Sequence, residues 1–217
     1  RAKNSLLGRA LPHRIFFLHV PKCGGTSINS AISSLYKRLD VRKDRCIQRH
    51  DSKMSALASG IVDGYDYAHD PVDDYEHMRF RQIHLAYMMS NPEVSYISGH
   101  VPFNNDTYSA LSSEFSYLTI LRDPVDKWLS YYYFCKSRDS ETLVIDEALE
   151  SFLESDRGSK IGYDYVKYFG GIREDSDYAS ASALESAKVN LHKFSIVGFL
   201  DDLPGFTQSF YSNFGRK

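Results

Sequence analysis

The sequence predicts an α/β fold in three layers, with a central parallel sheet flanked by helices on both faces. Apolar runs rich in strand-forming residues recur at 14–20, 94–98, 116–121 and 194–199. Segments with helical spacing of apolar residues alternate with these runs, which is typical of a parallel sheet covered by helices. The first run, RIFFLHV, is apolar almost throughout, as expected for a strand buried on both faces.

The helices are predicted from spacing and end residues. Residues 26–38 carry apolar side chains at helical spacing, with Thr26 or Ser27 as the N-cap. Pro124 suits the first turn of a helix that continues over 125–136. Further helices are predicted at 142–155, 182–192 and 201–214. Residues 40–80 are polar and charge-mixed, so we expect loops with at most short helices there.

Length and charge restrict the class of protein. The chain has 217 residues, which suits a single domain over 1–217. Its 26 Lys and Arg against 28 Asp and Glu argue against bulk attraction to nucleic acid or anionic membrane. No apolar run approaches the roughly 20 residues of a membrane span. The first residue is Arg1 and not Met, so trimming at the N-terminus, and with it an anchor, stays open.

The stretch HVPKCGGTS, directly after the first strand, predicts an anion site. The N-terminus of a helix presents unpaired N–H groups and a partial positive charge, which bind phosphate or sulfate. Gly24 and Gly25 let the backbone approach an anion closely. Lys22 adds a charge, and Thr26 and Ser27 add hydroxyl donors. The domain is therefore expected to be P-loop-like; the alternative is an ordinary strand–helix turn with an N-cap.

The order of residues in this loop disfavours two familiar chemistries. A Walker loop places its lysine after the glycines, whereas Lys22 precedes them. No strand-end aspartate suits Mg²⁺ clearly, since Asp123 follows Arg122, which argues against a kinase or ATPase. A cysteine-phosphatase reading of Cys23 fails because no arginine follows a few residues downstream, so Cys23 is interpreted as a small spacer.

Two further stretches follow strand ends. In LTILRDPVDKWLSYYYF, 118–134, Arg122 offers a fork of donors suited to phosphate, and Ser130 lies two turns into the following helix. In YISGHVPF, 96–103, His100 follows the strand at 94–98. Ligands of parallel sheets bind beyond the carboxyl ends of the strands, where these groups are expected. A neutral imidazole suits a general base near pH 7; the alternative is a histidine hydrogen-bonded at a strand end.

All three stretches resemble motifs of sulfotransferases that use 3′-phosphoadenosine 5′-phosphosulfate (PAPS). HVPKCGGTS resembles their 5′-phosphosulfate loop, P-K-x-G-[GST]-[ST]-[ST] between a strand and a helix. LTILRDPVDKWLSYYYF resembles their 3′-phosphate motif, with Lys127 where many members have a second arginine. YISGHVPF resembles the heparan and uronyl 2-O-sulfotransferases, in which the histidine is the proposed base. Ser98 stands where that branch usually has another histidine.

The resemblance implies a PAPS-dependent O-sulfotransferase that moves a sulfuryl group to a hydroxyl of a carbohydrate acceptor. The product would be 3′,5′-ADP, with no metal required and no nucleic acid partner. It implies that Lys22 and His100 are catalytic. It also implies a set of cofactor-binding residues, namely Lys22, Cys23, Gly24, Gly25, Thr26, Ser27, Arg122 and Ser130.

Two alternatives stay open. Ser98 motivates a non-catalytic nucleotide- or glycan-binding module of the same fold. A P-loop kinase is the other, although the position of Lys22 argues against it. Family members occur both in the Golgi lumen and as soluble bacterial enzymes. The three cysteines, too few for a disulfide framework, tilt the expectation towards a cytoplasmic bacterial protein. The sequence predicts neither the acceptor's identity nor the oligomeric state.

The other histidines are expected to be structural. His19 is expected to pack against the first strand, and His13, His50 and His192 to lie at the surface. His69, His77 and His84 fall in the polar middle region, where His84 with Arg79 and Arg81 could contact an anionic acceptor; solvent exposure is the preferred interpretation. The stretch DPVDD, 70–74, lacks the full calcium-loop pattern and is read as an acidic loop.

Overall fold

The computed structural model describes residues 11–36, 46–64, 75–137, 144–174 and 177–215. Its sheet is parallel throughout, with strand order β2-β3-β1-β4-β5. The strands are β1 (Arg14–Leu18), β2 (Ile47–Arg49), β3 (Tyr96–Gly99), β4 (Phe115–Leu121) and β5 (Ile196–Phe199). The four predicted strands and the α/β fold class are thereby confirmed.

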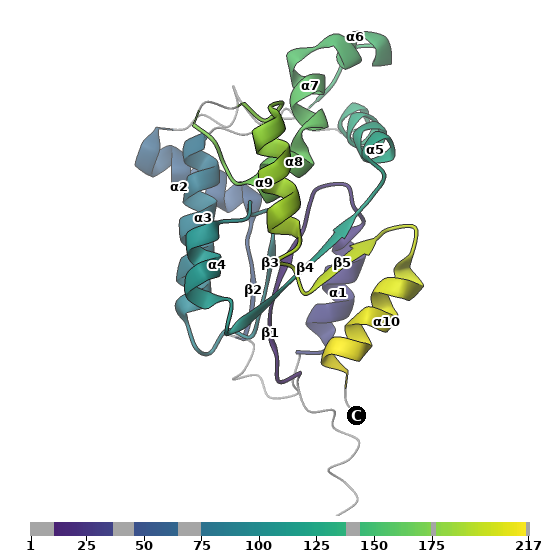
Figure 1. Ribbon diagram of the computed structural model, residues 1–217. Coiled ribbons are helices and arrows are strands. Elements are labelled where there is room, and N and C mark those ends of the chain that lie inside the picture. Colours follow the sequence, from purple (N-terminus) through teal and green to yellow (C-terminus); the bar gives the residue numbers. More distant parts are fainter. Residues whose placement is uncertain (1–10, 37–45, 65–74, 138–143, 175–176, 216–217) are drawn as a thin grey trace, which may run out of the picture.

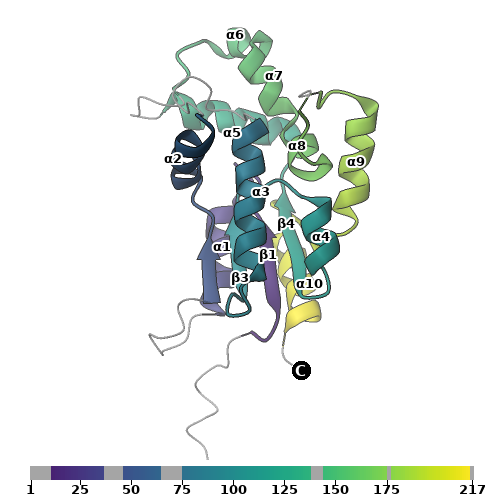
Figure 2. The same ribbon diagram turned by 90° about the vertical axis from the view of Figure 1, so that its left-hand side faces the viewer.

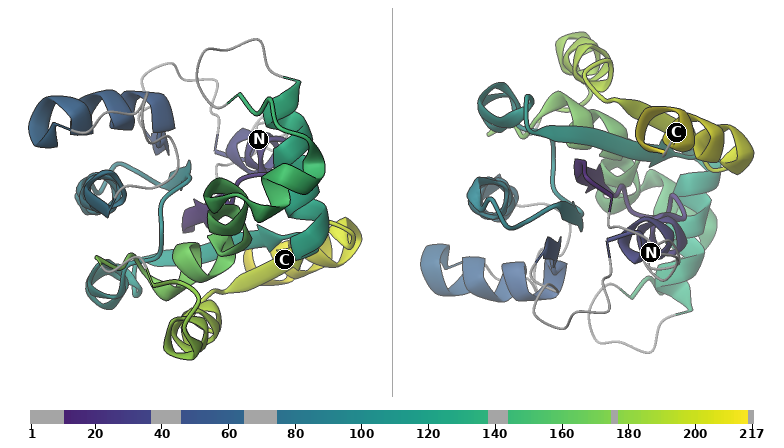
Figure 3. Two further views of the ribbon diagram at one scale, coloured as in Figure 1. Left: turned by 90° about the horizontal axis from the view of Figure 1, so that it is seen from above. Right: turned by 90° about the horizontal axis from the view of Figure 1, so that it is seen from below.

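Helices cover both faces of this sheet and one of its ends. They are α1 (Gly25–Ser34), α2 (Ser52–Asp63), α3 (Tyr75–Ser90), α4 (Asn105–Leu111), α5 (Pro124–Lys136), α6 (Leu149–Glu154), α7 (Asp156–Gly162), α8 (Asp164–Gly170), α9 (Ala181–Leu191) and α10 (Leu203–Phe214). Figures 1 and 2 show α1 and α10 on one face, and α3, α4 and α9 on the other. Seen from above, α5 to α8 lie over the carboxyl ends of the strands (Figure 3).

The central strand is fully buried after its first residue. Ile15, Phe16, Phe17 and Leu18 expose none of their surface, because helices cover both faces of β1. Aromatic rings complete the core on one side: Phe103 and Phe194 pack around Tyr117 with centroids about 6 Å apart. Burial of rings of this size is a large stabilising contribution, and it fixes the position of the loops that leave the strands.

The pairing register aligns the ends of three neighbouring strands. Leu18 of β1 pairs with Gly99 of β3 and with Thr119 of β4. The Thr119 hydroxyl also donates to the Leu18 carbonyl at 2.9 Å. The segments that follow β1, β3 and β4 therefore leave the sheet at the same edge. β3 and β4 lie on opposite sides of β1, so the direction in which strands are added to the sheet reverses at β1. Open α/β sheets bind ligands at the carboxyl edge beside such a reversal.

The expectation of loops with at most short helices over 40–80 is wrong within the described residues. β2, α2 and the start of α3 lie there. The sequence of α2 shows no apolar stripe that matches its buried face, because its apolar Leu57 and Ile61 are exposed while Ser55 and Ser59 are buried. The stretch DPVDD and His69 lie outside the described residues.

The predicted helix over 142–155 is also wrong in extent. Within its described part only Leu149–Glu154 is helical, and Asp156–Gly162 forms a separate helix. Ser155 ends one helix and caps the next, since its hydroxyl accepts from the Gly158 amide at 3.0 Å. The apolar residues of this segment still pack as a core, with the Phe152 ring 5.2 Å from that of Trp128. Elsewhere in the described chain, the predicted helices at 125–136, 182–192 and 201–214 are confirmed within about two residues.

Candidate active site

The loop between β1 and α1 has a helix N-terminus without a side-chain cap. Gly24 is the N-cap, at φ 69°, and within the part of the chain that the structure describes no side chain caps α1. The expected cap by Thr26 or Ser27 is therefore wrong. Both hydroxyl residues lie instead in the first turn, exposed to solvent. The uncapped amides and these hydroxyls are donors suited to an anion.

The two glycines are required for close packing within the protein. A Cβ on Gly25 would lie 2.0 Å from the His19 ring, and one on Gly24 would lie 2.5 Å from a Leu200 methyl. The left-handed φ of Gly24 adds a second reason for glycine. The sequence predicts that these glycines leave space for an anion, but in the structure the side chains of His19 and Leu200 occupy the space beside their Cα atoms. What remains available to an anion is the backbone amides.

Lys22 has a left-handed backbone, at φ 66°, the single non-glycine residue with positive φ in the described chain. Such a conformation is costly for a residue with a Cβ and persists only when its surroundings enforce it. Its ammonium nitrogen lies 3.6 Å from the centroid of the Phe134 ring on α5. The loop lysine is therefore directed towards the helix that also carries Ser130.

Arg122 ends the neighbouring strand and begins the second predicted motif. Asp123 caps α5, and its carboxylate accepts from the amides of Val125 and Asp126. Arg122 and Ser130 are both half-buried. Among the described residues no carboxylate forms an ion pair with the Arg122 guanidinium. Its five donors are thus suited to an external phosphate.

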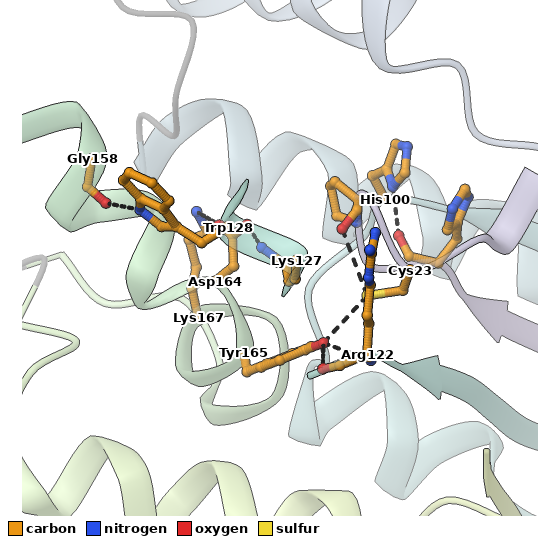
Figure 4. A network of polar contacts seen from close by, with 11 residues as sticks. Cys23, His100, Arg122, Lys127, Trp128, Gly158, Asp164, Tyr165 and Lys167 are labelled. Atoms are coloured by element: carbon orange, nitrogen blue, oxygen red, sulfur yellow. Dashed lines mark hydrogen bonds and ion pairs between the residues drawn. The ribbon is translucent and has the colours of Figure 1, made fainter. Parts of the chain in front are cut away.

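Tyr165 of α8 links the two motifs, as Figure 4 shows. Its hydroxyl donates to the Arg122 carbonyl at 2.6 Å and accepts from the Arg122 amide at 2.8 Å. The same oxygen lies 3.3 Å from the Cys23 sulfur. Burial raises the pKa of Tyr165 and that of the Cys23 thiol, so both groups stay protonated at neutral pH.

A buried ion-pair cluster stands next to this link. The Asp164 carboxylate pairs with Lys127 of α5, and its other oxygen accepts from Lys167 at 2.9 Å. All three side chains are at most 6% exposed. Lys127, at the position where the sequence resemblance expects an arginine, therefore joins α5 to α8 in this chain.

His100 is held in one tautomer. Its Nδ1 lies 2.5 Å from the His19 carbonyl oxygen, which can only accept a hydrogen bond. Nδ1 therefore carries the proton, and in the neutral ring the free lone pair is on Nε2. Burial is the main cause that lowers the pKa of His100 to about 4, with Arg81 and Arg49 contributing. A base with its lone pair available at neutral pH is the result.

The backbone of His100 is braced from α3. Arg81, which is 6% exposed, donates to the His100 carbonyl at 3.1 Å and to His77 at 3.2 Å. The Ser55 hydroxyl of α2 lies 3.2 Å from the same His77 nitrogen. These contacts connect α2 and α3, two helices that the sequence did not predict, to the backbone of His100, the candidate base.

The expectation that His50, His77 and Arg81 lie at the surface or in solvent is wrong. His50 is 2% exposed and His77 is 1% exposed. His84 is half-buried, with its ring 5.5 Å from that of His50. Burial lowers the pKa of His50 and of His77 to about 3. His13 and His192 are exposed as expected, and His19 stacks on Phe17 at the end of β1.

The structure therefore brings the predicted residues to one edge of the sheet and adds residues that sequence reasoning missed. The β1–α1 loop, His100 and Arg122 follow three adjacent strands. The missed residues are Tyr165, Asp164 and Phe134, and the contact of Arg81 with the His100 carbonyl was not predicted either. A single tyrosine among 16 gives no sequence signal, and Phe134 and Arg81 belong to no spacing pattern that reasoning from the sequence alone could use.

The candidate phosphate donors form two sets, one on each side of the Tyr165 link. Uncapped amides and Lys22 stand at one side of the Tyr165 link, and Arg122 with Ser130 at the other. Among the described residues, no three His, Cys, Asp or Glu side chains lie together as ligands for a metal ion. None of the described helices combines the length and apolarity needed to cross a membrane.

Comparison with known proteins gives a family and one distant structural likeness. The sulfotransferase domain family matches residues 12–173. Heparan sulfate 2-O-sulfotransferase 1 of Xenopus laevis is 25% identical over 123 residues, which is 51% of this chain and 35% of that protein. A crystal structure of shikimate kinase from Bacteroides thetaiotaomicron has a TM-score of 0.48 at 11% identity, and the match covers 93% of this chain and 97% of that one. So distant a structural likeness carries no argument about function.

Fold and site together define an α/β domain with a phosphate-type loop at the carboxyl edge of its sheet. Because the family match covers well over half of the chain, the chain belongs to the sulfotransferase domain family. The matched segment corresponds to about a third of the Xenopus protein, 35% of its length.

Proposed function

We propose that this chain transfers a sulfuryl group from PAPS to a hydroxyl of a carbohydrate. The observation that carries the proposal is that Lys22, His100 and Arg122 lie in the segments that follow three adjacent strands, and that these strands are paired in register at that edge. The lone pair of His100 and the cation of Lys22 are two groups that an in-line displacement at sulfur requires. As in phosphoryl transfer, positioning and charge stabilisation supply the catalysis.

The cofactor side is assigned to the two motifs. PAPS, when bound, supplies the activated sulfuryl group, whose bond to the 5′-phosphate oxygen breaks during transfer. Lys22 stabilises the charge that develops on the departing phosphate, helped by the amides of Cys23, Gly24, Gly25 and Thr26 and the hydroxyls of Thr26 and Ser27. Arg122 and Ser130 hold the 3′-phosphate, which distinguishes this nucleotide from other adenylates.

The acceptor side is assigned to His100. Its Nε2 receives the proton of the acceptor hydroxyl as that oxygen forms a bond to sulfur. A positioned base of this kind typically contributes roughly 10²–10⁴-fold to the rate. The tautomer set by the His19 carbonyl supports this role, since it leaves Nε2 free. Arg49, exposed at the end of β2, lies near enough to lower the pKa of His100. Its positive charge would attract an acceptor that carries negative charge.

The test is transfer of labelled sulfuryl from PAPS to acidic and neutral polysaccharides. We expect turnover on a polysaccharide, loss of at least about 10²-fold in His100→Ala, and little change in His192→Ala, an exposed histidine far from the loops. Arg49→Ala should raise KM for an acidic acceptor more than for a neutral one. Turnover that survives unchanged in His100→Ala would contradict the assignment of the base.

A non-catalytic binding module is the second candidate. Ser98, 3% exposed within β3, provides no second imidazole beside His100. This candidate is favoured if the chain binds 3′,5′-ADP and transfers no sulfuryl group to any acceptor tested. A P-loop kinase is favoured only if Mg²⁺-ATP is bound with no preference for a 3′-phosphate.

A further inference from the structure

The Tyr165 hydroxyl makes all of its hydrogen-bonding contacts with atoms of the two motifs expected to bind the nucleotide. Its one proton goes to the Arg122 carbonyl, 2.6 Å away. Its lone pairs face the Arg122 amide at 2.8 Å and the Cys23 sulfur at 3.3 Å. The Cys23 thiol must therefore donate to the tyrosine oxygen whenever the two are bonded, because the tyrosine proton is already committed. A single oxygen thus joins the end of β4 to the loop after β1.

The residue next to Tyr165 fixes the same helix to α5. Asp164 pairs with Lys127, which lies one turn before Ser130 on α5. Trp128 of α5 adds a contact to the preceding helix, donating to the Gly158 carbonyl at 2.8 Å. Consequently the short helix α8 contacts all three parts of the expected nucleotide site. These parts are the 5′ loop, the Arg122 backbone and the helix that carries Ser130.

Neither of these links contributes a group to a phosphate. The Tyr165 hydroxyl is engaged by protein atoms, and both carboxylate oxygens of Asp164 are engaged by the buried lysines Lys127 and Lys167. Their effect is on geometry: they set how far the Arg122–Ser130 pair stands from the amides of the loop. A ligand with two phosphates gains from both sites at once only if that separation matches its own.

We propose that Tyr165 is a positioning residue that holds the 5′-phosphate loop and the 3′-phosphate motif at the separation of a nucleoside 3′,5′-bisphosphate. Selection for a nucleotide with both phosphates then depends on the tyrosine hydroxyl as well as on Arg122 and Ser130. The inference rests on the proposed function, since it assumes that those motifs bind the two phosphates.

The experiment measures the dissociation constants of 3′,5′-ADP, 5′-AMP and 3′-AMP by calorimetry for the wild-type chain and Tyr165→Phe. Phenylalanine keeps the ring and removes only the hydroxyl. We expect about tenfold weaker binding of 3′,5′-ADP, as for the loss of one buried hydrogen-bonded group, and less than about twofold change for either monophosphate. Tyr163→Phe, which alters an exposed tyrosine two residues earlier, should leave all three constants unchanged.

A Cys23→Ala variant extends the test and protects it against misfolding of Tyr165→Phe. It removes the other end of the link while the tyrosine remains bonded to Arg122. We expect a smaller loss of affinity for 3′,5′-ADP in Cys23→Ala than in Tyr165→Phe. The double variant should bind 3′,5′-ADP no more weakly than Tyr165→Phe alone, because both substitutions remove the same link.

The three dissociation constants distinguish failure of the positioning role of Tyr165 from failure of the proposed function. Equal weakening of all three ligands, or an unchanged preference for 3′,5′-ADP in folded Tyr165→Phe, overturns the positioning role and leaves the proposed function intact. A wild-type chain that binds none of the three nucleotides overturns both. If only Cys23→Ala is folded, an unchanged affinity for 3′,5′-ADP in that variant also overturns the role.

Discussion

The ammonium nitrogen of Lys22 lies 3.6 Å from the centre of the Phe134 ring. The two residues come from different motifs, since Lys22 belongs to the loop after β1 and Phe134 to the last turns of α5. Phe134 stands one turn beyond Ser130, so one helix carries both a candidate phosphate ligand and an aromatic platform for the candidate catalytic cation. A cation against a ring face is attracted by the ring quadrupole, which restricts where the lysine can go.

Replacing Phe134 by leucine should therefore lower kcat more than it weakens cofactor binding. Loss of a partly exposed cation–π contact is worth about 1 kcal/mol, or roughly fivefold in rate. Steady-state kinetics with PAPS check this, with Tyr133→Leu, an exposed aromatic neighbour, as the control. Phe134→Tyr should restore the rate because it restores the ring. A leucine variant with wild-type kcat would show that the ring does not position Lys22.

Titration of His100 should not change the rate of sulfuryl transfer near pH 7. Because its pKa is lowered to about 4, Nε2 is unprotonated at pH 7 and gains a proton only as the pH falls through about 4. The acid limb of kcat/KM, which reports the free enzyme, is expected there. Arg49→Ala removes a positive charge that lowers this pKa and should move the limb upwards. A limb near pH 6.5 in the wild type would contradict the burial of the base.

Folding stability should fall as the pH falls below about 6.5. The pKa values of His50 and His77 are lowered from 6.5 to about 3 in the folded chain, so the unfolded chain binds more protons between these values. Stability is thus fully present above 6.5 and is lost progressively down to about 3, by about 1.4 kcal/mol per pH unit for each histidine.

His50→Leu tests this pH dependence, because both ring nitrogens of His50 are buried and have no hydrogen-bond partner among the described residues. Chemical denaturation at pH 7.5 and 5.5 should show a stability loss about 1 kcal/mol smaller than in the wild type. His192→Leu, at an exposed position, provides the comparison. The same loss in both variants would mean that His50 does not titrate as its burial requires.

Removing Asp164 should be more harmful than removing either of its lysines. Asp164→Asn leaves two buried ammonium groups facing each other, and breaking a buried pair this way typically costs about 3–5 kcal/mol. Lys167→Met leaves the Asp164–Lys127 pair in place and should cost less. Denaturant unfolding of the two variants gives the order directly. The reverse order would indicate that the cluster is not held together by the carboxylate.

The sheet and the site motifs were predictable because their physics is local. A strand buried on both faces of a parallel sheet is apolar, and the sequence RIFFL of β1 shows this pattern. Proline and aspartate mark the start of α5 in the sequence itself. His100 and Arg122 could be placed at the carboxyl edge because each follows a strand. Such features do not depend on distant partners.

The features that sequence reasoning missed depend on partners far away in the chain. The helix α3 buries His77, Arg81 and Gln82 along with apolar residues, so it shows no apolar stripe. Its polar side chains are stabilised by contacts with His100 and the loop after it, which no local pattern reveals. Tyr165 acts across more than 40 residues on Arg122. Pairings of this kind appear only when the fold brings the segments together.

The central claim, a site for a nucleotide with both a 5′- and a 3′-phosphate, is tested most directly by thermal unfolding with 3′,5′-ADP, 5′-AMP and Mg²⁺-ATP side by side. A ligand at 100 times its dissociation constant stabilises by about 2.7 kcal/mol, a shift of roughly 5–10 °C for a domain of this size. We predict that shift with 3′,5′-ADP, a markedly smaller one with 5′-AMP, and loss of the difference in Arg122→Ala. A shift with Mg²⁺-ATP alone would contradict the sulfotransferase assignment.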